Sequence, residues 1–417
     1  MAHQSLSITS LGFQGDGISA EGIFVPLTLP GEVVQADVHK DRADLLDIIT
    51  ASPDRTDPVC RHFSRCGGCA LQHWEINAYS AWKRDLVISL LSKAGLETQI
   101  DPILTTPPHS RRRVGLHAKR INGPKGAFRV ELGFKMRKSW DQVRIEECPV
   151  ADPRIVAALP SLTELAKALF EHPKSAPILN VTVSETGLDI DIRGVERSKS
   201  GGLSADGRMQ IAMTASAADF ARVTLSDEIQ YMARAPQVRF GRAIVDLPFG
   251  PFLQASPKSE ADMVRLVTQA VAGAKKVADL FCGSGTFTFP LAEQAVVYAA
   301  DGAAGAVGAL KSAMGRVSGL KTITAEVRDL YRRPMLAAEM NGFDAIVFDP
   351  PRAGAEDQAR EIALSAVKRV VAVSCNPQTF IRDVRILTEA GFSLDKVTPI
   401  DQFLWSGHVE LVGVLSR

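Results

Sequence analysis

Cys375 lies at the end of a short apolar run, Val370 to Val373, and is followed by Asn-Pro, which cannot continue a strand. A structural cysteine is usually enclosed within such a run, whereas this one lies at its margin. Taken alone, the position suits two explanations equally well. The thiol is either a nucleophile presented at a strand end or a buried residue that closes the strand.

Three more cysteines fall within ten residues, in CRHFSRCGGC, and a fourth follows in RIEECPV. The pattern is Cys60-x5-Cys66-x2-Cys69, with Cys148 distant in sequence. Four thiolates with a Gly-Gly turn between two of them can hold zinc or an iron–sulfur cluster, and the spacing does not choose between these. Free core cysteines explain the segment poorly, because Arg, His and Gly surround them. Cys282 lies elsewhere, in a glycine loop, and is expected to pack.

That glycine loop, VADLFCGSGTFTFPLA (277–292), joins a predicted strand to a predicted helix. Gly283 and Gly285 permit a tight turn and a close approach of a ligand to the backbone. Thr288 replaces the third glycine of the dinucleotide fingerprint, and there is no Walker lysine, so dehydrogenase and P-loop sites are weakly supported. Asp301 ends the next strand, where an acid can bind ribose hydroxyls. These residues favour an S-adenosylmethionine site.

The loop Asp349-Pro350-Pro351-Arg352 ends a later predicted strand, at the edge where open α/β sheets bind ligands. Its two prolines lock the backbone, so an ordinary rigid turn is the alternative. Methyltransferases that act on base amino groups typically carry an aromatic residue where Arg352 stands. The loop therefore argues against amino-nitrogen chemistry.

The elements that must position these residues change in character near residue 241. Residues 1–50 consist of short β segments and turns that suggest a small β-barrel, and 77–96 has apolar residues at helical spacing. Residues from about 110 to 240 mix strands and helices. Beyond 241, strands alternate with helices, which predicts a parallel, doubly wound sheet with a last strand pair near KVTPID and HVELVGVL. The predicted strands of that series are 277–281, 296–301, 322–327, 343–349 and 369–375.

Bulk composition narrows the class of protein. The chain has 417 residues, 46% of them hydrophobic, which suits two or three folded domains. Its net charge of +1 hides a basic segment, 109–144, with eleven Lys or Arg against two acids. That segment is either a solvated charged face or a polyanion contact. We expect no signal peptide, no membrane span and a cytoplasmic location, because the N-terminus lacks a basic and an apolar region and no long apolar run exists.

The chain resembles the RNA uracil-5-methyltransferases over nearly its whole length. FLQAS (252–256), DLFCGSGTFTFP, DPPRAG, SCNPQTFIRD and HVELV occur in that family's order. The cysteine pattern is similar to that of the iron–sulfur branch, which acts on 23S ribosomal RNA. The resemblance implies an α/β fold with three domains. These are a TRAM-like β-barrel (1–54), a central mixed iron–sulfur and RNA-binding domain (55–240) whose helix 77–96 can pack on the catalytic domain, and a Rossmann-like S-adenosylmethionine-dependent methyltransferase domain (241–417).

The same resemblance implies which residues act. It favours a [4Fe-4S] cluster over zinc at the four clustered cysteines, Cys60, Cys66, Cys69 and Cys148. Cys375 is then the nucleophile and Glu410 the base. Close relatives have Asn after Gly-x-Gly, where this chain has Thr286, whose hydroxyl can still form a hydrogen bond. The cofactor contacts implied are Gln254, Phe281, Thr286, Asp301, Asp329 and Asp349.

In the implied reaction, the Cys375 thiolate adds to carbon 6 of uracil, so that carbon 5 can take a methyl group. Glu410 then removes the carbon 5 proton. The thiol must be partly ionised, so we expect its surroundings to lower its pKa. The uridine must also leave its stack. The residues predicted to hold the RNA backbone are Arg111, Arg112, Arg113, Lys119, Arg120, Lys125, Arg129, Lys135, Arg137 and Lys138.

Two other functions compete with methylation of 23S ribosomal RNA. One is a transfer RNA uracil-5-methyltransferase, a branch that generally lacks the cysteine cluster. The other is a non-catalytic iron–sulfur RNA-binding module, which the intact Cys375, Glu410 and glycine loop disfavour. RNA is the partner expected in every case, and no obligate protein partner is evident.

Overall fold

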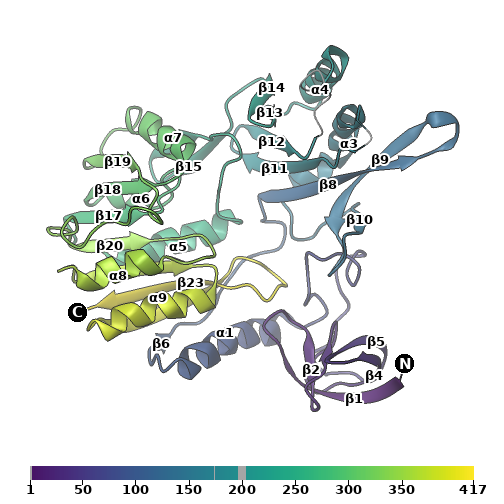
Figure 1. Ribbon diagram of the computed structural model, residues 1–417, viewed down its shortest axis with the longest axis horizontal. Helices are drawn as coiled ribbons and strands as arrows, with labels where there is room; N and C mark the ends of the chain where they lie inside the picture. The colour runs from purple at the N-terminus through teal and green to yellow at the C-terminus, as the bar shows by residue number, and fades with distance from the viewer. Residues whose placement is uncertain (1, 173, 196–202) are drawn as a thin grey trace.

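A computed structural model of the chain describes residues 2–172, 174–195 and 203–417. Within these residues the strands form a closed barrel, a seven-stranded sheet, a two-stranded hairpin and a nine-stranded sheet. Figure 1 shows the nine-stranded sheet and its helices on the left, the seven-stranded sheet at upper right and the barrel at lower right. This arrangement confirms the α/β fold class and the small N-terminal barrel predicted from the sequence.

The barrel closes because β1 pairs with both β2 and β4, so that its five strands form a ring. Alternate side chains point inward, and Leu6, Ile8, Val34 and Ala36 fill the interior. The strands are β1 (Ala2–Leu11), β2 (Gly17–Ser19), β3 (Phe24–Val25), β4 (Val33–His39) and β5 (Arg42–Thr50).

The seven-stranded sheet runs in the order β10-β9-β8-β11-β12-β13-β14, and helices α3 and α4 pack against it. Its longest strands, β8 and β9, form a hairpin that extends away from the body of the molecule (Figure 1). The strands are β8 (Arg113–Asn122), β9 (Phe128–Lys135), β10 (Gln142–Arg144), β11 (Ile178–Ser184), β12 (Gly187–Arg193), β13 (Arg222–Leu225) and β14 (Glu228–Met232). The helices are α2 (Pro153–Ala157), α3 (Leu159–Lys167) and α4 (Ala205–Ala217), with 3-10 turns at Pro124–Gly126 and Ala168–Phe170.

The nine-stranded sheet has the order β19-β18-β17-β20-β21-β23-β22-β6, and β7 also pairs with β22. Strands β17 to β21 are parallel, whereas β23 is antiparallel to both of its neighbours. The five predicted parallel strands are confirmed, with ends shifted by two residues at most. The strands are β17 (Lys276–Leu280), β18 (Val296–Asp301), β19 (Ile323–Val327), β20 (Ala345–Phe348), β21 (Arg369–Ser374), β22 (Ser393–Asp401), β23 (Glu410–Ser416), β6 (Gln99–Ile100) and β7 (Leu104–Thr105).

Helices cover both faces of this sheet. One face packs against α1, α8 and α9, whose buried side chains include Val87, Ile362 and Val384. The other face packs against α5 and α6. No described helix is long and apolar enough to cross a membrane. The helices are α1 (Ile76–Lys93), α5 (Pro257–Ala270), α6 (Thr288–Ala292), α7 (Ala304–Met314), α8 (Glu356–Leu364) and α9 (Pro377–Glu389).

Two short segments join this body from earlier in the chain. Helix α1 packs on the sheet through a fully buried ion pair between Lys83 and Asp401, and strands β6 and β7 then pair with β22. The hairpin of β15 (Gln237–Phe240) and β16 (Ala243–Asp246) packs against α7. The stretch 55–240 therefore includes elements that lie with the nine-stranded sheet, and residue 241 falls in the turn of this hairpin.

Candidate active site

The sheet topology brings Cys375 and Glu410 to one edge. Cys375 follows the last residue of β21, and Glu410 is the first residue of β23. Because β23 runs antiparallel to β21, with Ser374 opposite Leu411, the start of one strand lies beside the end of the other. Asp349 follows the neighbouring strand β20 at the same edge. Residues far apart in the chain thus meet where the parallel strands end.

The backbone around Cys375 is fixed by Asn376. Its side chain accepts a hydrogen bond from the Gln378 amide (3.1 Å) and so caps α9, while its Nδ2 donates to the Arg352 carbonyl (3.0 Å). These bonds lock the thiol between β21, α9 and the Asp349–Arg352 loop. Cys375 itself is half-buried.

The expectation of a lowered pKa at Cys375 is wrong for the protein without ligands. Burial, together with the charges of Glu410 and Asp349, raises the pKa of this thiol to about 11. Arg352 opposes them and lowers the pKa. A single cation therefore faces two carboxylates.

Glu410 is buried, and burial raises its pKa well above the ordinary value, with the charge of Asp349 acting in the same direction. Gln402 opposes this shift, because its Nε2 donates to Glu410 Oε2 (3.0 Å). The same Nε2 donates to Gln254 Oε1 (2.9 Å), and Gln254 Nε2 donates to Asp349 Oδ2 (3.0 Å). Two amides thus connect Glu410 to Asp349.

Sequence reasoning missed Gln402. Its orientation is set by the Ala255 amide, which donates to Gln402 Oε1 (2.8 Å) and leaves the Nε2 group facing Glu410. The available signal was modest: a polar residue follows the end of a strand, eight positions before Glu410. Arg352 also has an unpredicted partner, because its Nη2 donates to His408 Nδ1 (3.0 Å).

Acidic side chains also gather beneath the glycine loop. Asp279 is fully buried, and burial raises its pKa to about 7. Its Oδ2 accepts from the Thr288 hydroxyl (2.5 Å), but its Oδ1 has no hydrogen-bond partner in the described part of the chain. Burial also raises the pKa of Asp349 to about 7. A buried carboxylate with a free oxygen, close to other acids, suits a positively charged ligand.

The other predicted cofactor residues lie around the same loop. Asp301 accepts from the amides of Gly283 (2.9 Å) and Ala303 (2.7 Å). Phe281 has a positive φ of 63°, unusual for an aromatic residue, and its ring centroid lies 5.6 Å from that of Tyr331. The Tyr331 amide donates to Asp329 Oδ1 (3.1 Å).

Thr286 is half-buried and directly follows Gly285, whose φ is 103°. Cys282 is buried in the apolar cluster beside Phe289, as predicted. The loop therefore presents Thr286 near its surface and keeps the Cys282 thiol in the core.

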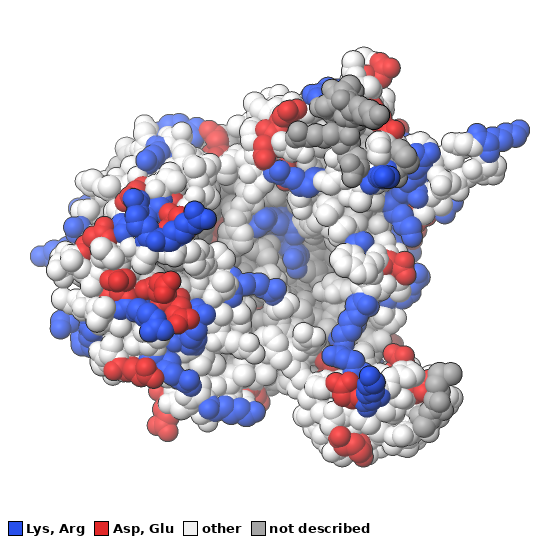
Figure 2. All heavy atoms as spheres, viewed as in Figure 1, with Lys and Arg blue, Asp and Glu red and all other residues white. Residues whose placement is uncertain are grey.

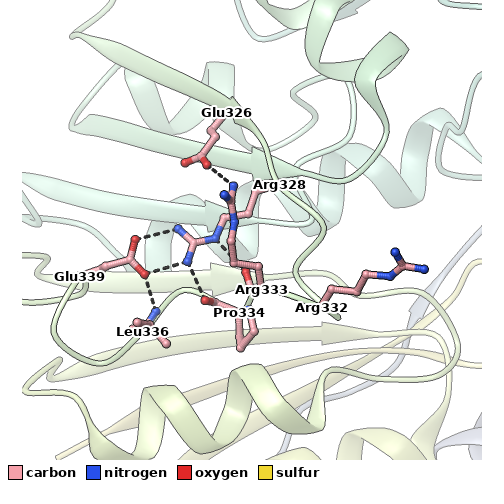
Figure 3. Close-up of a pocket in the computed structure, with 7 residues that line it drawn as sticks. All are labelled: Glu326, Arg328, Arg332, Arg333, Pro334, Leu336 and Glu339. Atoms are coloured by element: carbon pink, nitrogen blue, oxygen red, sulfur yellow. Dashed lines mark hydrogen bonds and ion pairs between the residues drawn. The ribbon is translucent and has the colours of Figure 1, made fainter.

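A hollow of about 450 Å³ lies beside the segment that carries Asp329 (Figure 3). Its charged groups are largely paired with one another. Arg328 donates two hydrogen bonds to Glu339 (2.8 and 2.7 Å) and holds the pKa of that carboxyl at about 2. Arg333 donates to Glu326 (2.6 Å). These pairs brace the segment around Asp329.

Cys60, Cys66 and Cys69 lie on the loop before α1, and Cys148 follows β10. Burial, together with the charge of Cys148, raises the pKa of each of the first three thiols, to about 12 for Cys69. The four thiols are thus neighbours in space. Across the described residues, however, no three His, Cys, Asp or Glu side chains are arranged to hold a metal ion.

Of the three arginines predicted to hold the RNA backbone at 111–113, Arg112 does not face solvent, and Arg111 and Arg113 are half-buried. Arg112 is buried, forms an ion pair with Glu260 and donates to the Gln254 carbonyl (2.9 Å). Arg113 donates to the Leu253 carbonyl (2.8 Å). Their cationic groups tie the seven-stranded sheet to the segment that carries Gln254. Figure 2 shows a hollow between the two large lobes, with Lys and Arg side chains within it and along the protruding hairpin.

Comparison with known proteins places these features in a family. A model of the tRNA (uracil-5-)-methyltransferase family matches residues 206–417. An uncharacterized RNA methyltransferase of Caulobacter vibrioides is 58% identical over 99% of this chain and 100% of that protein. The 23S rRNA (uracil(1939)-C(5))-methyltransferase of Vibrio vulnificus is 28% identical over 100% of this chain and 96% of its own.

Among solved structures, the tRNA (uracil-54, C5)-methyltransferase of Pyrococcus abyssi, in complex with S-adenosyl-L-homocysteine, aligns over all of both chains. The TM-score is 0.75 and the sequence identity 24%, so this likeness concerns the fold. It extends through the barrel and both large sheets.

Proposed function

The chain belongs to the tRNA (uracil-5-)-methyltransferase family and is an S-adenosylmethionine-dependent RNA methyltransferase, and we propose that it forms 5-methyluridine in 23S ribosomal RNA. Cys375 is the nucleophile and Glu410 the base. The observation that carries this proposal is their meeting at one strand edge, where the end of β21 lies beside the start of the antiparallel strand β23. The family membership sets aside the non-catalytic module.

Carbon 5 of uracil is a weak nucleophile until a thiolate adds to carbon 6. Cys375 forms that bond, and the electron pair displaced from the ring makes carbon 5 reactive. S-adenosylmethionine, when bound, supplies the methyl group and carries a positive charge. Glu410 then takes the proton from carbon 5, and the electrons of that C–H bond expel the Cys375 thiolate. Cys375 thus activates carbon 5 of the ring, and Glu410 restores the double bond between carbons 5 and 6.

The residues around the glycine loop fit the cofactor. The unpartnered Oδ1 of Asp279 and the raised pKa values of Asp279 and Asp349 mark a place where positive charge is stabilised. Gln254, Phe281, Thr286, Asp301 and Asp329 complete the proposed contacts. Positive charge beside Asp349 also reduces the repulsion that keeps the Cys375 thiol protonated. Arg352 and the N-terminus of α9 act in the same direction.

A trapped intermediate tests the division of labour. Glu410→Gln keeps the nucleophile but removes the base, so methyl transfer proceeds and the carbon 5 proton stays. The thiolate cannot leave, and a methylated protein–RNA adduct should accumulate as a slow band in denaturing electrophoresis. Cys375→Ala should give neither adduct nor methylation.

Two controls sharpen this test. Cys375→Ala placed in the Glu410→Gln background should abolish the slow band, whereas Cys282→Ala in that background should retain it, because Cys282 packs in the core. Normal turnover by Glu410→Gln would show that another group is the base. Methylation by Cys375→Ala would overturn the mechanism.

The ribosomal target rests on two supports, the four-cysteine pattern and the similarity to the Vibrio enzyme. A transfer RNA target is the second candidate, because the Pyrococcus enzyme of similar fold acts on tRNA. Mapping 5-methyluridine in both RNAs, from cells with and without the protein, separates them. Loss of the modification from 23S ribosomal RNA supports the proposal, and loss from tRNA alone contradicts it.

We assign a [4Fe-4S] cluster to Cys60, Cys66, Cys69 and Cys148. Four neighbouring thiols match its donor set, and a four-iron cluster is larger than one ion, so its ligands need not converge on one point. Anaerobically purified protein should contain about four iron and four sulfide per chain. Cys66→Ser should lose the brown colour, and stoichiometric zinc without sulfide would contradict the assignment.

A further inference from the structure

Trp140 is the most exposed large hydrophobic side chain among the residues that the structure describes, at 90% exposure, followed by Leu364 at 76%. It lies in the turn between β9 and β10. Indole rings have a large apolar surface and are ordinarily mostly buried, so a fully presented Trp needs an explanation.

The surroundings of Trp140 are cationic. The ring borders a hollow of about 230 Å³, smaller than most pockets for whole ligands and suited to one flat group. Lys135 Nζ lies 5.7 Å from the ring centroid and donates to the Trp140 carbonyl (2.8 Å). Among the described residues, no Asp or Glu borders this hollow. Its lining residues are His117, Ala118, Lys119, Lys135, Trp140, Gln142, Ala176 and Pro177.

The turn that carries Trp140 is held from three sides. The Met136 amide donates to the Asp141 carbonyl (2.8 Å), which closes the turn. The Gly67 amide, from the loop with three of the clustered cysteines, donates to the Lys135 carbonyl (2.9 Å). Asp16 of the barrel pairs with Arg137 and with Lys138 (2.9 Å). Barrel, cysteine loop and hairpin thus fix the backbone of the turn that presents the indole before any partner binds.

We propose that Trp140 is a stacking platform for a base of single-stranded RNA, outside the methyl-transfer site, with Lys119 and Lys135 holding the adjacent phosphates. Asp141 follows Trp140 in the chain and Glu131 lies opposite Lys119, but neither borders the hollow, whose lining combines an aromatic face with two lysines. An aromatic face beside cations is the combination that binds unpaired nucleotides. A protein partner would need a wider apolar surface than one indole ring offers. The inference rests on the proposed function, because it names a second contact of the same RNA substrate.

Equilibrium binding of a single-stranded RNA of about 12 nucleotides tests the platform, with Trp140→Ala, Trp140→Phe and Leu364→Ala as the variants. Trp140→Ala should bind about tenfold more weakly, Trp140→Phe should lose less because it keeps a ring, and Leu364→Ala should match the wild type. Lys119→Gln should reduce the salt dependence of binding by about one unit of slope. Far-UV circular dichroism should show the same fold in all four.

Tryptophan fluorescence gives a second readout. Trp74 and Trp405 are buried and Trp82 is half-buried, so stacking on Trp140 should quench the most solvent-exposed emission on RNA addition. The quench should vanish in Trp140→Ala. Unchanged affinity in that variant, or a quench that persists in it, would overturn the proposal, as would equal binding of the RNA as a duplex.

Failure of this inference can be told from failure of the proposed function. Cys375→Ala protein should bind the RNA with wild-type affinity and show the same fluorescence quench, because stacking needs no nucleophile. If wild-type protein makes no 5-methyluridine but RNA still quenches the Trp140 emission, the proposed function fails and the platform stands. If methylation proceeds and Trp140→Ala changes neither affinity nor quenching, the platform fails alone.

Discussion

The edge of the nine-stranded sheet and the β8–β9 hairpin carry their charges in opposite ways. At the edge, Asp279 and Glu410 are buried, and burial raises their pKa values. On the hairpin, Lys119, Lys125 and Arg129 are exposed. The proposed bond-making at the edge needs charges in fixed positions away from water. Binding to an RNA backbone instead needs cations that reach into the solvent.

The arginine run at the start of β8 shows that neighbours in the sequence can belong to different groups, one of buried charges and one of exposed cations. Arg112 is adjacent to the hairpin in the chain, yet it belongs with the edge, because it pairs with Glu260 and supports the backbone of Gln254. A basic segment therefore contains both structural and surface cations, and the fold assigns each its role.

Removing Arg112 should have the largest effect. Arg112→Met leaves Glu260 buried without its partner, which should lower the free energy of unfolding by about 3–5 kcal/mol. Urea titration measures this, with exposed Arg129→Gln as the control, which should stay close to the wild type. The assignment of Arg112 to the structural group would be wrong if Arg112→Met were as stable as wild type and lost salt dependence in RNA binding.

Removing Gln402 should have an intermediate effect. Gln402→Ala removes the hydrogen bond that lowers the pKa of Glu410, so that pKa rises further. Because the base acts as the carboxylate, activity increases with pH through this pKa, and the rising limb of the pH profile should move to higher pH. We expect kcat to fall about tenfold at neutral pH.

The control for Gln402 is Gln294→Ala, an exposed amide on the same body, which should leave the profile in place. High pH should restore much of the Gln402→Ala activity, because the base ionises there. A uniform loss at every pH would show that Gln402 acts only by packing.

The exposed hairpin cations should have the smallest effect. Lys125→Gln with Arg129→Gln should leave stability unchanged and reduce the salt slope of RNA binding by about one unit for each lost phosphate contact. Cofactor affinity should not change. A fall in stability comparable to that of Arg112→Met would remove the distinction between the two regions.

The sequence predicted the parallel strands well. A short apolar run rich in β-branched residues, such as Val370 to Val373, is typical of a strand that is covered by helices on both faces. It also picked out Glu410, an acid within an apolar strand, and Cys375 at a strand end, although their roles stay predictions. It missed Gln402 and the burial of Arg112, whose partners Gln254 and Glu260 each lie 148 residues away. Local pattern does not reveal such distant contacts.

The pKa of Cys375 was misjudged for a related reason. The expectation considered what the thiol must do and not which charges surround it. Burial of the thiol raises its pKa most, and the charges of Glu410 and Asp349, which approach it from separate strands, add to this effect and outweigh Arg352. The balance of charges at a sheet edge depends on strand order, which a single sequence leaves open.

The attachment of α1, β6 and β7 to the nine-stranded sheet has a consequence for how the chain is made. The buried Lys83–Asp401 pair joins residues 318 positions apart, so the segment that completes the sheet emerges from the ribosome long before the strand it must cover. Until β22 is synthesised, Lys83 has no counter-charge. Conversely, a fragment cut at the start of the family match, residue 206, leaves the edge of β22 open to pairing with other chains. Such a fragment should aggregate, because it lacks β6 and β7, which cover this edge in the full chain.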